Sequence, residues 1–185
     1  MNSEFQDACK QAKIAIHLNY LSNVLDFALR LPDSDFCCLG EQDVMELLLL
    51  SDHALAIQNE NAVKTALKIY TKLQTNFPAL DLSEEIEYTH SFGSQSTGNY
   101  TPRPREKCPV CDELVSNINN TSLAQCNAGH FWELCSITKR VLSDPKMRKC
   151  STCGAKALIA KHDGSLTDMI LKQCVRCINC GSGFY

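Results

Sequence analysis

Three non-overlapping CxxC motifs lie in the C-terminal half of this 185-residue sequence: CPVC from Cys108, CSTCG from Cys150 and CINCG from Cys177. A tight turn across such a pair places the two sulfur atoms roughly 3.8 Å apart, as tetrahedral zinc requires at a Zn–S distance of about 2.3 Å. Glycines follow the second and third motifs and suit the left-handed residue that closes such a turn. Three motifs in one short region, without a βαβ pattern, favour structural zinc over a redox function.

The stretch CNAGHFWELC, between the first and second motifs, adds Cys126, His130 and Cys135. This order is typical of a cross-braced zinc module, in which one site would combine Cys126 and His130 with the second CxxC motif. The other site would use the first motif, completed by Cys135 or by members of the Cys174–Cys177–Cys180 run. The sequence leaves this partition open, and we expect two zinc ions, with three as the alternative. The candidate ligands are Cys108, Cys111, Cys126, His130, Cys135, Cys150, Cys153, Cys174, Cys177 and Cys180.

A different chemistry for the same stretch would be a cysteine nucleophile activated by His130. We do not favour it, because a metal-bound thiolate is already occupied and no third orienting group is evident. Phe131 and Trp132 are interpreted as core residues that pack around the metals. Each structural zinc would supply on the order of 10 kcal/mol of folding free energy to a region with few large apolar side chains.

The elements that must position these residues fall into three segments. Residues 1–89 predict an acidic array of antiparallel helices, with apolar residues at helical spacing over about 3–31, 41–58 and 61–77. Residues 90–105, HSFGSQSTGNYTPRPR, predict a flexible linker. Residues 106–185 predict a small α+β, binuclear zinc-binding module of RING-like or treble-clef type. His17 is expected to be a partly buried helix residue, and Cys9, Cys37 and Cys38 to be packing residues.

Composition and charge exclude several classes of protein. The longest apolar run, Met45–Leu50, is too short to cross a bilayer, and the N-terminal residues do not resemble a signal peptide. We therefore expect a reducing compartment, where 12 cysteines favour metal over disulfides. Residues 1–100 have a formal charge of −8 and residues 101–185 of +5.

The cysteine-rich region resembles a known family. Its order, CPVC, CNAGHFWELCSIT, KCSTCG and CVRCINCG, is similar to the zinc-finger module of the transcription factor IIIC family, over roughly residues 106–185. The family's central signature, C-x-x-G-H-x-W followed by C-x-x-T, is matched by Cys126, Gly129, His130, Trp132, Cys135 and Thr138. Leu134 departs from the family, which usually has arginine there. The β-propeller that precedes this module in the family's WD-repeat subunit is not evident, so we expect a fragment or a free-standing relative.

The resemblance implies a nuclear, non-enzymatic subunit that scaffolds a complex at transfer RNA genes and recruits RNA polymerase III, with other subunits of the complex as partners. Acetyltransferase activity is attributed to the family, but the sequence has no Gly-rich acetyl-CoA loop. We expect no membrane or small-molecule partner. One alternative is a RING-type ubiquitin ligase, although Ser151 stands where such a ligase would have proline. A second is the zinc-capped end of a trafficking or signalling coat subunit.

A basic stretch raises the question of direct DNA contact. The candidate patch comprises Lys139, Arg140, Lys146, Arg148 and Lys149, with Arg103, Arg105 and Lys107 as further cations. Thiolate ligands would reduce the formal charge of this half to about +2, and no base-reading helix stands out. We therefore expect contact with promoter DNA to be indirect.

Overall fold

The computed structural model describes residues 3–92, 100–118 and 122–185. Five helices come first: α1 (Ser3–Arg30), α2 (Asp33–Phe36), α3 (Glu41–Ile57), α4 (Glu60–Asn76) and α5 (Ser83–Ser91). Three strands form one antiparallel sheet, β1 (Val115–Asn117), β2 (Leu123–Cys126) and β3 (Phe131–Glu133). A two-stranded antiparallel sheet, β4 (Met147–Lys149) and β5 (Lys156–Leu158), precedes α6 (Leu166–Gln173). The prediction of a helical region followed by a small strand-containing region is confirmed.

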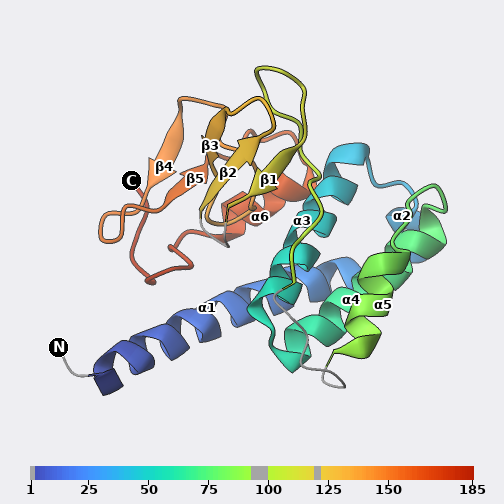
Figure 1. The fold of residues 1–185 in the computed structure, drawn as a ribbon, viewed down its shortest axis with the longest axis horizontal. Coiled ribbons are helices and arrows are strands. Elements are labelled where there is room, and N and C mark those ends of the chain that lie inside the picture. Colours follow the sequence, from blue (N-terminus) through green and yellow to red (C-terminus); the bar gives the residue numbers. More distant parts are fainter. Residues whose placement is uncertain (1–2, 93–99, 119–121) are drawn as a thin grey trace.

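The helical half, residues 1–89, packs α4 between α1 and α3 on one side and α5 on the other (Figure 1). The amides of Asn61 and Ala62 donate to the side chain of Asn59, which caps the start of α4. Gln58, in the left-handed conformation at φ 56°, ends α3. These boundaries agree with the predicted helices at residues 41–58 and 61–77 to within one or two residues.

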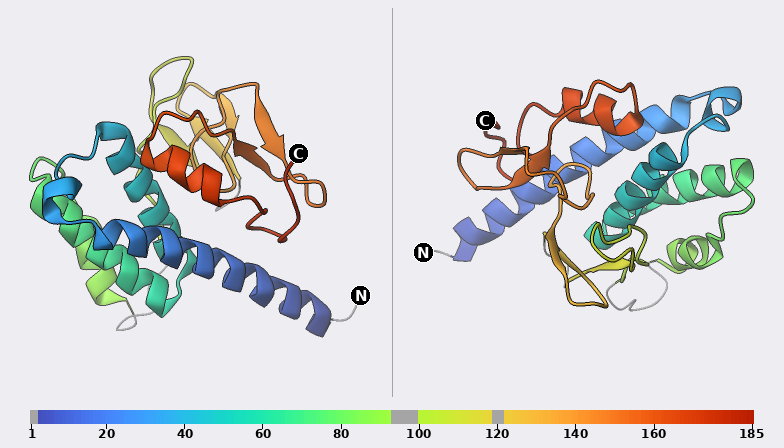
Figure 2. Two further views of the ribbon diagram at one scale, coloured as in Figure 1. Left: turned by 180° about the vertical axis from the view of Figure 1, so that it is seen from behind. Right: turned by 90° about the horizontal axis from the view of Figure 1, so that it is seen from above.

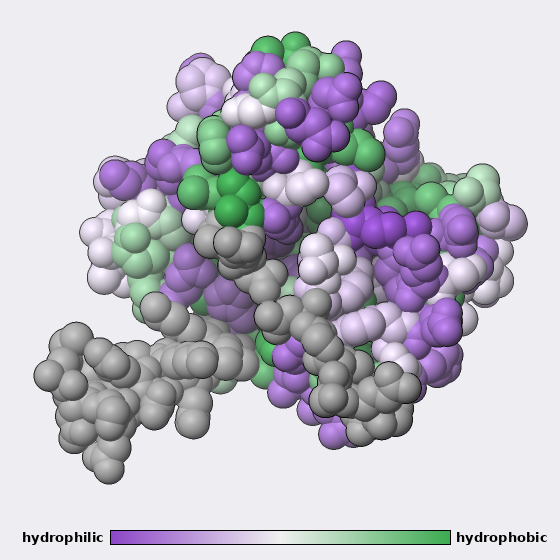
Figure 3. All heavy atoms as spheres, in the orientation of Figure 1, coloured by the Kyte–Doolittle hydropathy of each residue, from purple (hydrophilic) through white to green (hydrophobic). Residues whose placement is uncertain are grey.

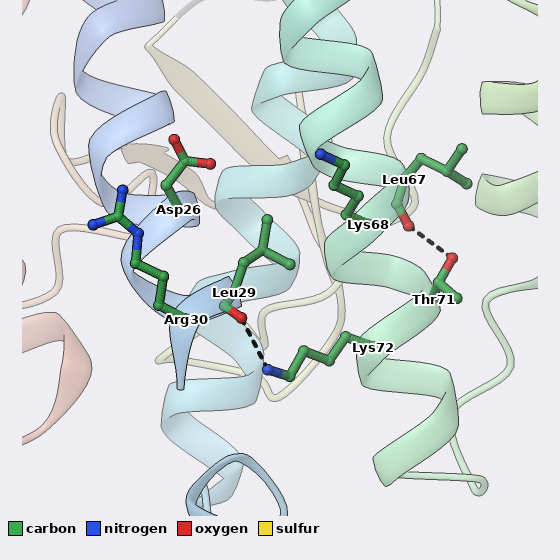
Figure 4. A pocket seen from close by; sticks show the side chains of 7 residues that line it. All are labelled: Asp26, Leu29, Arg30, Leu67, Lys68, Thr71 and Lys72. Carbon is green, nitrogen blue, oxygen red and sulfur yellow. Dashed lines mark hydrogen bonds between the residues drawn. The ribbon is translucent and has the colours of Figure 1, made fainter. Parts of the chain in front are cut away.

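Lys72 ties α4 to the end of α1. Its Nζ donates to the carbonyls of Leu29 and Leu31, at 3.1 and 2.6 Å, and lies 4.6 Å from the centre of the Phe36 ring. A cation is favourable here because the last carbonyls of a helix carry partial negative charge. Figure 4 shows Lys72 reaching across the shallow groove between α1 and α4, with Lys68 one turn earlier on α4 and Arg30 on the facing α1.

Cys37 and Cys38 differ from expectation. Both side chains are exposed, in the turn after α2, and both thiols donate to the carbonyl of Ser34 at 3.2 Å. The prediction that they are packing residues is wrong, because the chain turns away from the core immediately after the buried ring of Phe36. The side chain of Cys9 lies outside the described residues.

Part of the predicted linker packs against the helices. Residues 93–99 lie outside the described residues, but Arg103 and Arg105 form ion pairs with the helical half. Arg105 donates to Asp52 on α3 and, at 2.8 Å, to Glu85 on α5. Both carboxylates are almost fully buried, and Asp52 also accepts the hydroxyl of Tyr70 at 2.6 Å. These contacts fix the chain where it enters the zinc module, residues 106–185.

The zinc module lies against α1 and α3, and α4 and α5 lie beyond them (Figures 1 and 2). One buried hydrophobic cluster contains residues of both parts, including Leu47 on α3 and Ile137, Ile170 and Ile178 in the module. Polar contacts supplement it, because Asp43 on α3 accepts the amide of Leu166 at the start of α6. Figure 3 shows further hydrophobic side chains exposed on the outer end of the module. No helix in the described part of the chain is both long and apolar enough to span a bilayer.

Glu46, on α3, is fully buried at the contact with α6. Its Oε2 accepts the hydroxyl of Thr167 at 2.9 Å, and its Oε1 has no hydrogen-bond partner in the part of the chain that the structure describes. Burial raises the pKa of Glu46 to about 8, even though the Thr167 hydrogen bond acts to lower it. The ionised carboxylate therefore opposes folding at this position.

Replacing Glu46 with glutamine should stabilise the protein, and more so at pH 8 than at pH 5. The folded-state pKa is raised, so the wild type is most stable below the unfolded pKa and loses stability as the pH rises through the folded pKa. Glutamine removes this loss, with an expected gain on the order of 3 kcal/mol at pH 8. Urea unfolding at both pH values measures it, with the exposed Glu87→Gln as the matched control. The prediction would be contradicted if the unfolding free energies of the variant and the wild type differed by the same amount at pH 5 and pH 8.

Candidate metal centres

The three CxxC motifs share one backbone geometry. In each, the amide of the first cysteine donates to the carbonyl five residues later, and the amide of the fifth residue donates back to the carbonyl of that cysteine. The fifth residue has a positive φ in every case: Asp112 at 58°, Gly154 at 72° and Gly181 at 76°. The left-handed conformation predicted for the two glycines is confirmed, and aspartate takes the same place in the first motif.

The first cluster consists of Cys108, Cys111, Cys126 and His130. The sulfurs of Cys111 and Cys126 are 3.7 Å apart, and His130 Nδ1 lies 3.7 Å from the sulfur of Cys108 and 3.4 Å from that of Cys126. Strand pairing assembles it, because Val115 on β1, just after the first CxxC motif, is opposite Cys126 on β2. The turn from β2 to β3 then places His130 beside Cys126, with Gly129 at φ 87°.

Hydrogen bonds to sulfur favour the thiolate form in this cluster. Burial acts to raise the pKa of Cys108, but the amides of Val110 and Cys111 and the indole of Trp132 outweigh it and lower the pKa to about 6. Trp132 Nε1 donates to the sulfur of Cys108 at 3.3 Å. Trp132 was interpreted above as a core residue only; its place two residues after His130 was the signal for this second role.

The second cluster consists of Cys150, Cys153, Cys177 and Cys180. The sulfurs of Cys150 and Cys180 are 3.4 Å apart, and those of Cys153 and Cys177 are 3.5 Å apart. The pKa of Cys150 is lowered to about 6, mainly by the amide of Cys153. The C-terminal residues assemble this cluster, because the backbones of Lys149 and Tyr185 exchange two hydrogen bonds of 3.0 Å and so bring the third motif to the second.

Both clusters fit zinc. In each, the four possible ligand atoms lie within 4.8 Å of one another. Sulfur separations of 3.4–3.7 Å are close to the roughly 3.8 Å that a tetrahedral zinc requires. The first cluster offers one imidazole and three thiolates, and the second offers four thiolates. Both donor sets occur in structural zinc sites. The two clusters are thus consistent with two zinc ions, which would cross-link the loops of the module.

The structure groups the ligands differently from the partition favoured by the sequence. That partition combined Cys126 and His130 with Cys150 and Cys153, as in a cross-braced module. Instead, the four ligand candidates between Cys108 and His130 form one cluster. The four cluster residues between Cys150 and Cys180 form the other. The physical reason is local pairing: β1, β2 and β3 close the first cluster, and β4 with the C-terminus closes the second.

Cys135 and Cys174 belong to neither cluster. Cys135 is fully buried, and its sulfur accepts the amides of Thr138 and Leu158, both at 3.4 Å. Cys174 is partly buried at the end of α6, and burial raises the pKa of its thiol to about 11, which disfavours the thiolate. The two cysteines therefore occupy packing positions, which their spacing alone did not distinguish from ligand positions.

Cys135 opens a turn with the same geometry as the CxxC motifs. Its amide donates to the carbonyl of Arg140 at 2.7 Å, and the amide of Lys139 donates back to the carbonyl of Cys135 at 3.0 Å. Lys139 has φ 62°, like the fifth residue of each motif. Thr138 stands where the second cysteine of a CxxC motif would be. We call residues 135–140 the Cys135 turn.

Replacing Cys135 with alanine should leave two zinc ions bound per chain, because its sulfur is in neither cluster. The change leaves the buried amide of Thr138 and the partly buried amide of Leu158 without this acceptor, so we expect a loss of unfolding free energy of about 1–3 kcal/mol for the first and less for the second. Native mass spectrometry measures the zinc content, and Cys126→Ala, expected to retain one ion, is the control. A zinc content below two ions per chain in the Cys135→Ala variant would contradict this prediction.

The structure separates the members of the predicted basic patch. Arg140 is paired with Glu106 at 2.7 Å. Arg148 donates to three backbone carbonyls, of Leu158, Leu171 and Cys174. Lys139 lines a cleft between the two parts of the chain. Lys146 and Lys149 are exposed. Three of the five side chains are thus turned toward the protein rather than gathered on one outer surface.

Comparison with known proteins agrees with these clusters. Residues 87–184, more than half of the chain, match the family model described as "Putative zinc-finger of transcription factor IIIC complex". The chain is also 36% identical over 83 residues to the "Putative transcription factor tau subunit sfc9" of Schizosaccharomyces pombe. That alignment covers 43% of this chain and 12% of the fission yeast protein. The sequence match and the two Cys/His clusters lie in the same residues, and the chain belongs to the zinc-finger family of the transcription factor IIIC complex.

Proposed function

We propose that the chain is a non-enzymatic subunit, or a part of one, of a transcription factor IIIC complex, and that it serves there as a docking scaffold. The observation that carries this proposal is the family match, which begins in α5 and includes all eight residues of the two clusters. A transcription role is supported by the family, and the scaffold role is the further step proposed here.

The eight cluster residues are the proposed zinc ligands. Each site would take four ligands from the protein, which is typical of structural zinc, whereas catalytic zinc keeps one position for water or substrate. The core shared between the helical half and the zinc module supports a scaffold role, because it would hold the two parts in one fixed arrangement for partners to bind.

The partners would be other subunits of the complex, at the transfer RNA genes that RNA polymerase III transcribes, and the location would be nuclear. Contact with promoter DNA would be indirect. This is supported by the ion pairs of Arg103, Arg105 and Arg140, which leave fewer cations for phosphate than the sequence suggested.

Purification of the tagged chain from its native cells, followed by mass spectrometry of the co-purifying proteins, tests the proposal. We expect other transcription factor IIIC subunits to be recovered. A control purification with Cys150→Ser should lose those partners that dock on the zinc module. Recovery of ubiquitin-conjugating enzymes would instead indicate a RING-type ligase, and recovery of coat subunits a trafficking role; either result would overturn the proposal.

A further inference from the structure

A cleft of about 730 Å³ lies between the helical half and the zinc module. Its walls include His53 on α3, the segment Pro102–Glu106, and Ser136 and Lys139 of the Cys135 turn. The volume falls within the range of about 300–1,000 Å³ that is usual for ligand sites. Clefts of this kind are common where two parts of a protein meet.

The position of Lys139 in this cleft is unusual. It is the residue with positive φ in the Cys135 turn, a place that glycine takes in the second and third CxxC motifs. A side chain is strained in that conformation, whereas glycine is not. Strained residues that persist in a fold are concentrated at functional sites. The turn thus holds a lysine where the local backbone would favour glycine.

Lys139 also differs from the other charged groups that line the cleft. Asp52 is paired with Arg105, Glu106 with Arg140, Glu133 with Lys156, and Arg103 with Glu85. For Lys139, by contrast, the described part of the chain offers no acidic partner; its Nζ donates to the carbonyl of Ser136 at 2.9 Å. The cleft therefore contains one cation whose charge no carboxylate of the described residues balances.

One further group is placed to donate a hydrogen bond to an anion, and a second group connects the walls of the cleft. The hydroxyl of Ser136 is buried and has no hydrogen-bond partner among the described residues, although its residue lines the cleft. His53, also in the lining, is hydrogen-bonded to His17 at 3.2 Å, and His17 continues to Asn179 in the third CxxC motif at 3.0 Å. This chain of contacts holds the two walls of the cleft together.

We propose that the cleft binds an acidic peptide segment of a partner protein, with a carboxylate of that segment accepting hydrogen bonds from Lys139 and Ser136. Charge complementarity carries the choice of occupant, because the ammonium of Lys139 is near the sulfurs of Cys135 and Cys177 but has no carboxylate partner among the described residues. The hydroxyl of Ser136 has no partner among them either, so both groups can take a further acceptor. Leu49, Ile57 and Val141 in the walls suit the apolar part of a peptide better than a small inorganic anion. Burial lowers the pKa of Lys139 to about 8, and a bound carboxylate would offset that cost.

The test is a titration of the full, zinc-loaded chain, labelled with ¹⁵N, with two peptides of eight residues that differ only in glutamate against glutamine. We expect the glutamate peptide to shift the amide signals of Ser136, Lys139 and His53, and the glutamine peptide to leave them in place. Lys139→Met should weaken the affinity at least about tenfold, because it removes a charge-assisted hydrogen bond. Ser136→Ala should weaken it less, and the exposed Lys146→Met should not change it.

Three results would overturn the proposal. One is the absence of shifts at the cleft with the glutamate peptide. Another is equal affinity of Lys139→Met and Lys146→Met, once the spectrum of each variant shows that it is folded. The third is that inorganic phosphate, at millimolar concentration, displaces the peptide and shifts the amide signals of the same three residues. This result would indicate a phosphate group as the occupant.

Discussion

Replacing Cys150 with serine should reduce the zinc content of the chain from two ions to one. It should also unfold the part of the zinc module that surrounds the second cluster. Cys150 is buried in the four-cysteine cluster, where its sulfur lies 3.4 Å from that of Cys180. Structural zinc supplies on the order of 10 kcal/mol of folding free energy, and a serine hydroxyl is a poor substitute for a thiolate. This is the largest effect expected for a single substitution in the chain.

The loss of structure caused by Cys150→Ser should extend to the helical half. The third CxxC motif contains Asn179, which accepts a hydrogen bond from His17 on α1, and Ile178 belongs to the shared core. Without zinc in the second cluster, no metal–sulfur bonds link the third motif to the second motif, so we expect faster amide hydrogen exchange in α1 near His17. The first cluster should keep its ion, because β1, β2 and β3 assemble it independently.

Native mass spectrometry, a circular dichroism melt and hydrogen exchange together measure these effects. Cys37→Ser is the matched control, since Cys37 is an exposed cysteine outside both clusters, and it should leave all three measurements unchanged. Two zinc ions and an unaltered melt for Cys150→Ser would show that the ligand assignment is incorrect.

Replacing Arg105 with methionine should lower the unfolding free energy by about 3–5 kcal/mol, because removing one partner leaves buried charges uncompensated. Arg105 pairs with both Asp52 and Glu85, whose side chains are 4% and 2% exposed. Arg103 would still contact Glu85, at 2.6 Å, but of the described residues Asp52 would retain only the hydroxyls of Tyr70 and Tyr100. The main cost is therefore expected at Asp52.

Urea unfolding measures this loss, and the exposed Arg30→Met is the control, expected to change stability by less than about 0.5 kcal/mol. The double variant with Asp52→Asn should recover part of the loss, because the amide removes the unbalanced charge. A loss below 1 kcal/mol for Arg105→Met, or no recovery in the double variant, would contradict the interpretation.

Much of the metal chemistry could be predicted from the sequence, because it depends on local geometry. A CxxC turn closes within six residues, so its sulfur spacing and the left-handed Gly154 and Gly181 follow from the motif itself. The helices at residues 41–58 and 61–77 were predictable for the same reason, since hydrophobic periodicity and Asn59 as a cap act within one element.

The roles of individual cysteines were not predictable in this way. Cys135 follows His130 closely and matches a ligand pattern, yet its sulfur accepts amides, one of them from Leu158 on a distant strand. Trp132 resembles a core residue in sequence, yet its indole donates to Cys108. Leu158 and Cys108 both lie more than twenty positions along the chain from these residues, so sequence spacing does not identify them as the partners.

The sequence by itself thus predicted zinc as the metal, two ions with three as the alternative, the helical character of the first half and the family. Only the tertiary structure decided which ligands share an ion, because strand pairing and the contact between Lys149 and Tyr185 bring distant motifs together. It also decided that Arg103 and Arg105 fix the chain to α3 and α5, where composition predicted a linker. Those contacts depend on buried carboxylates elsewhere in the chain, and local composition does not reveal them.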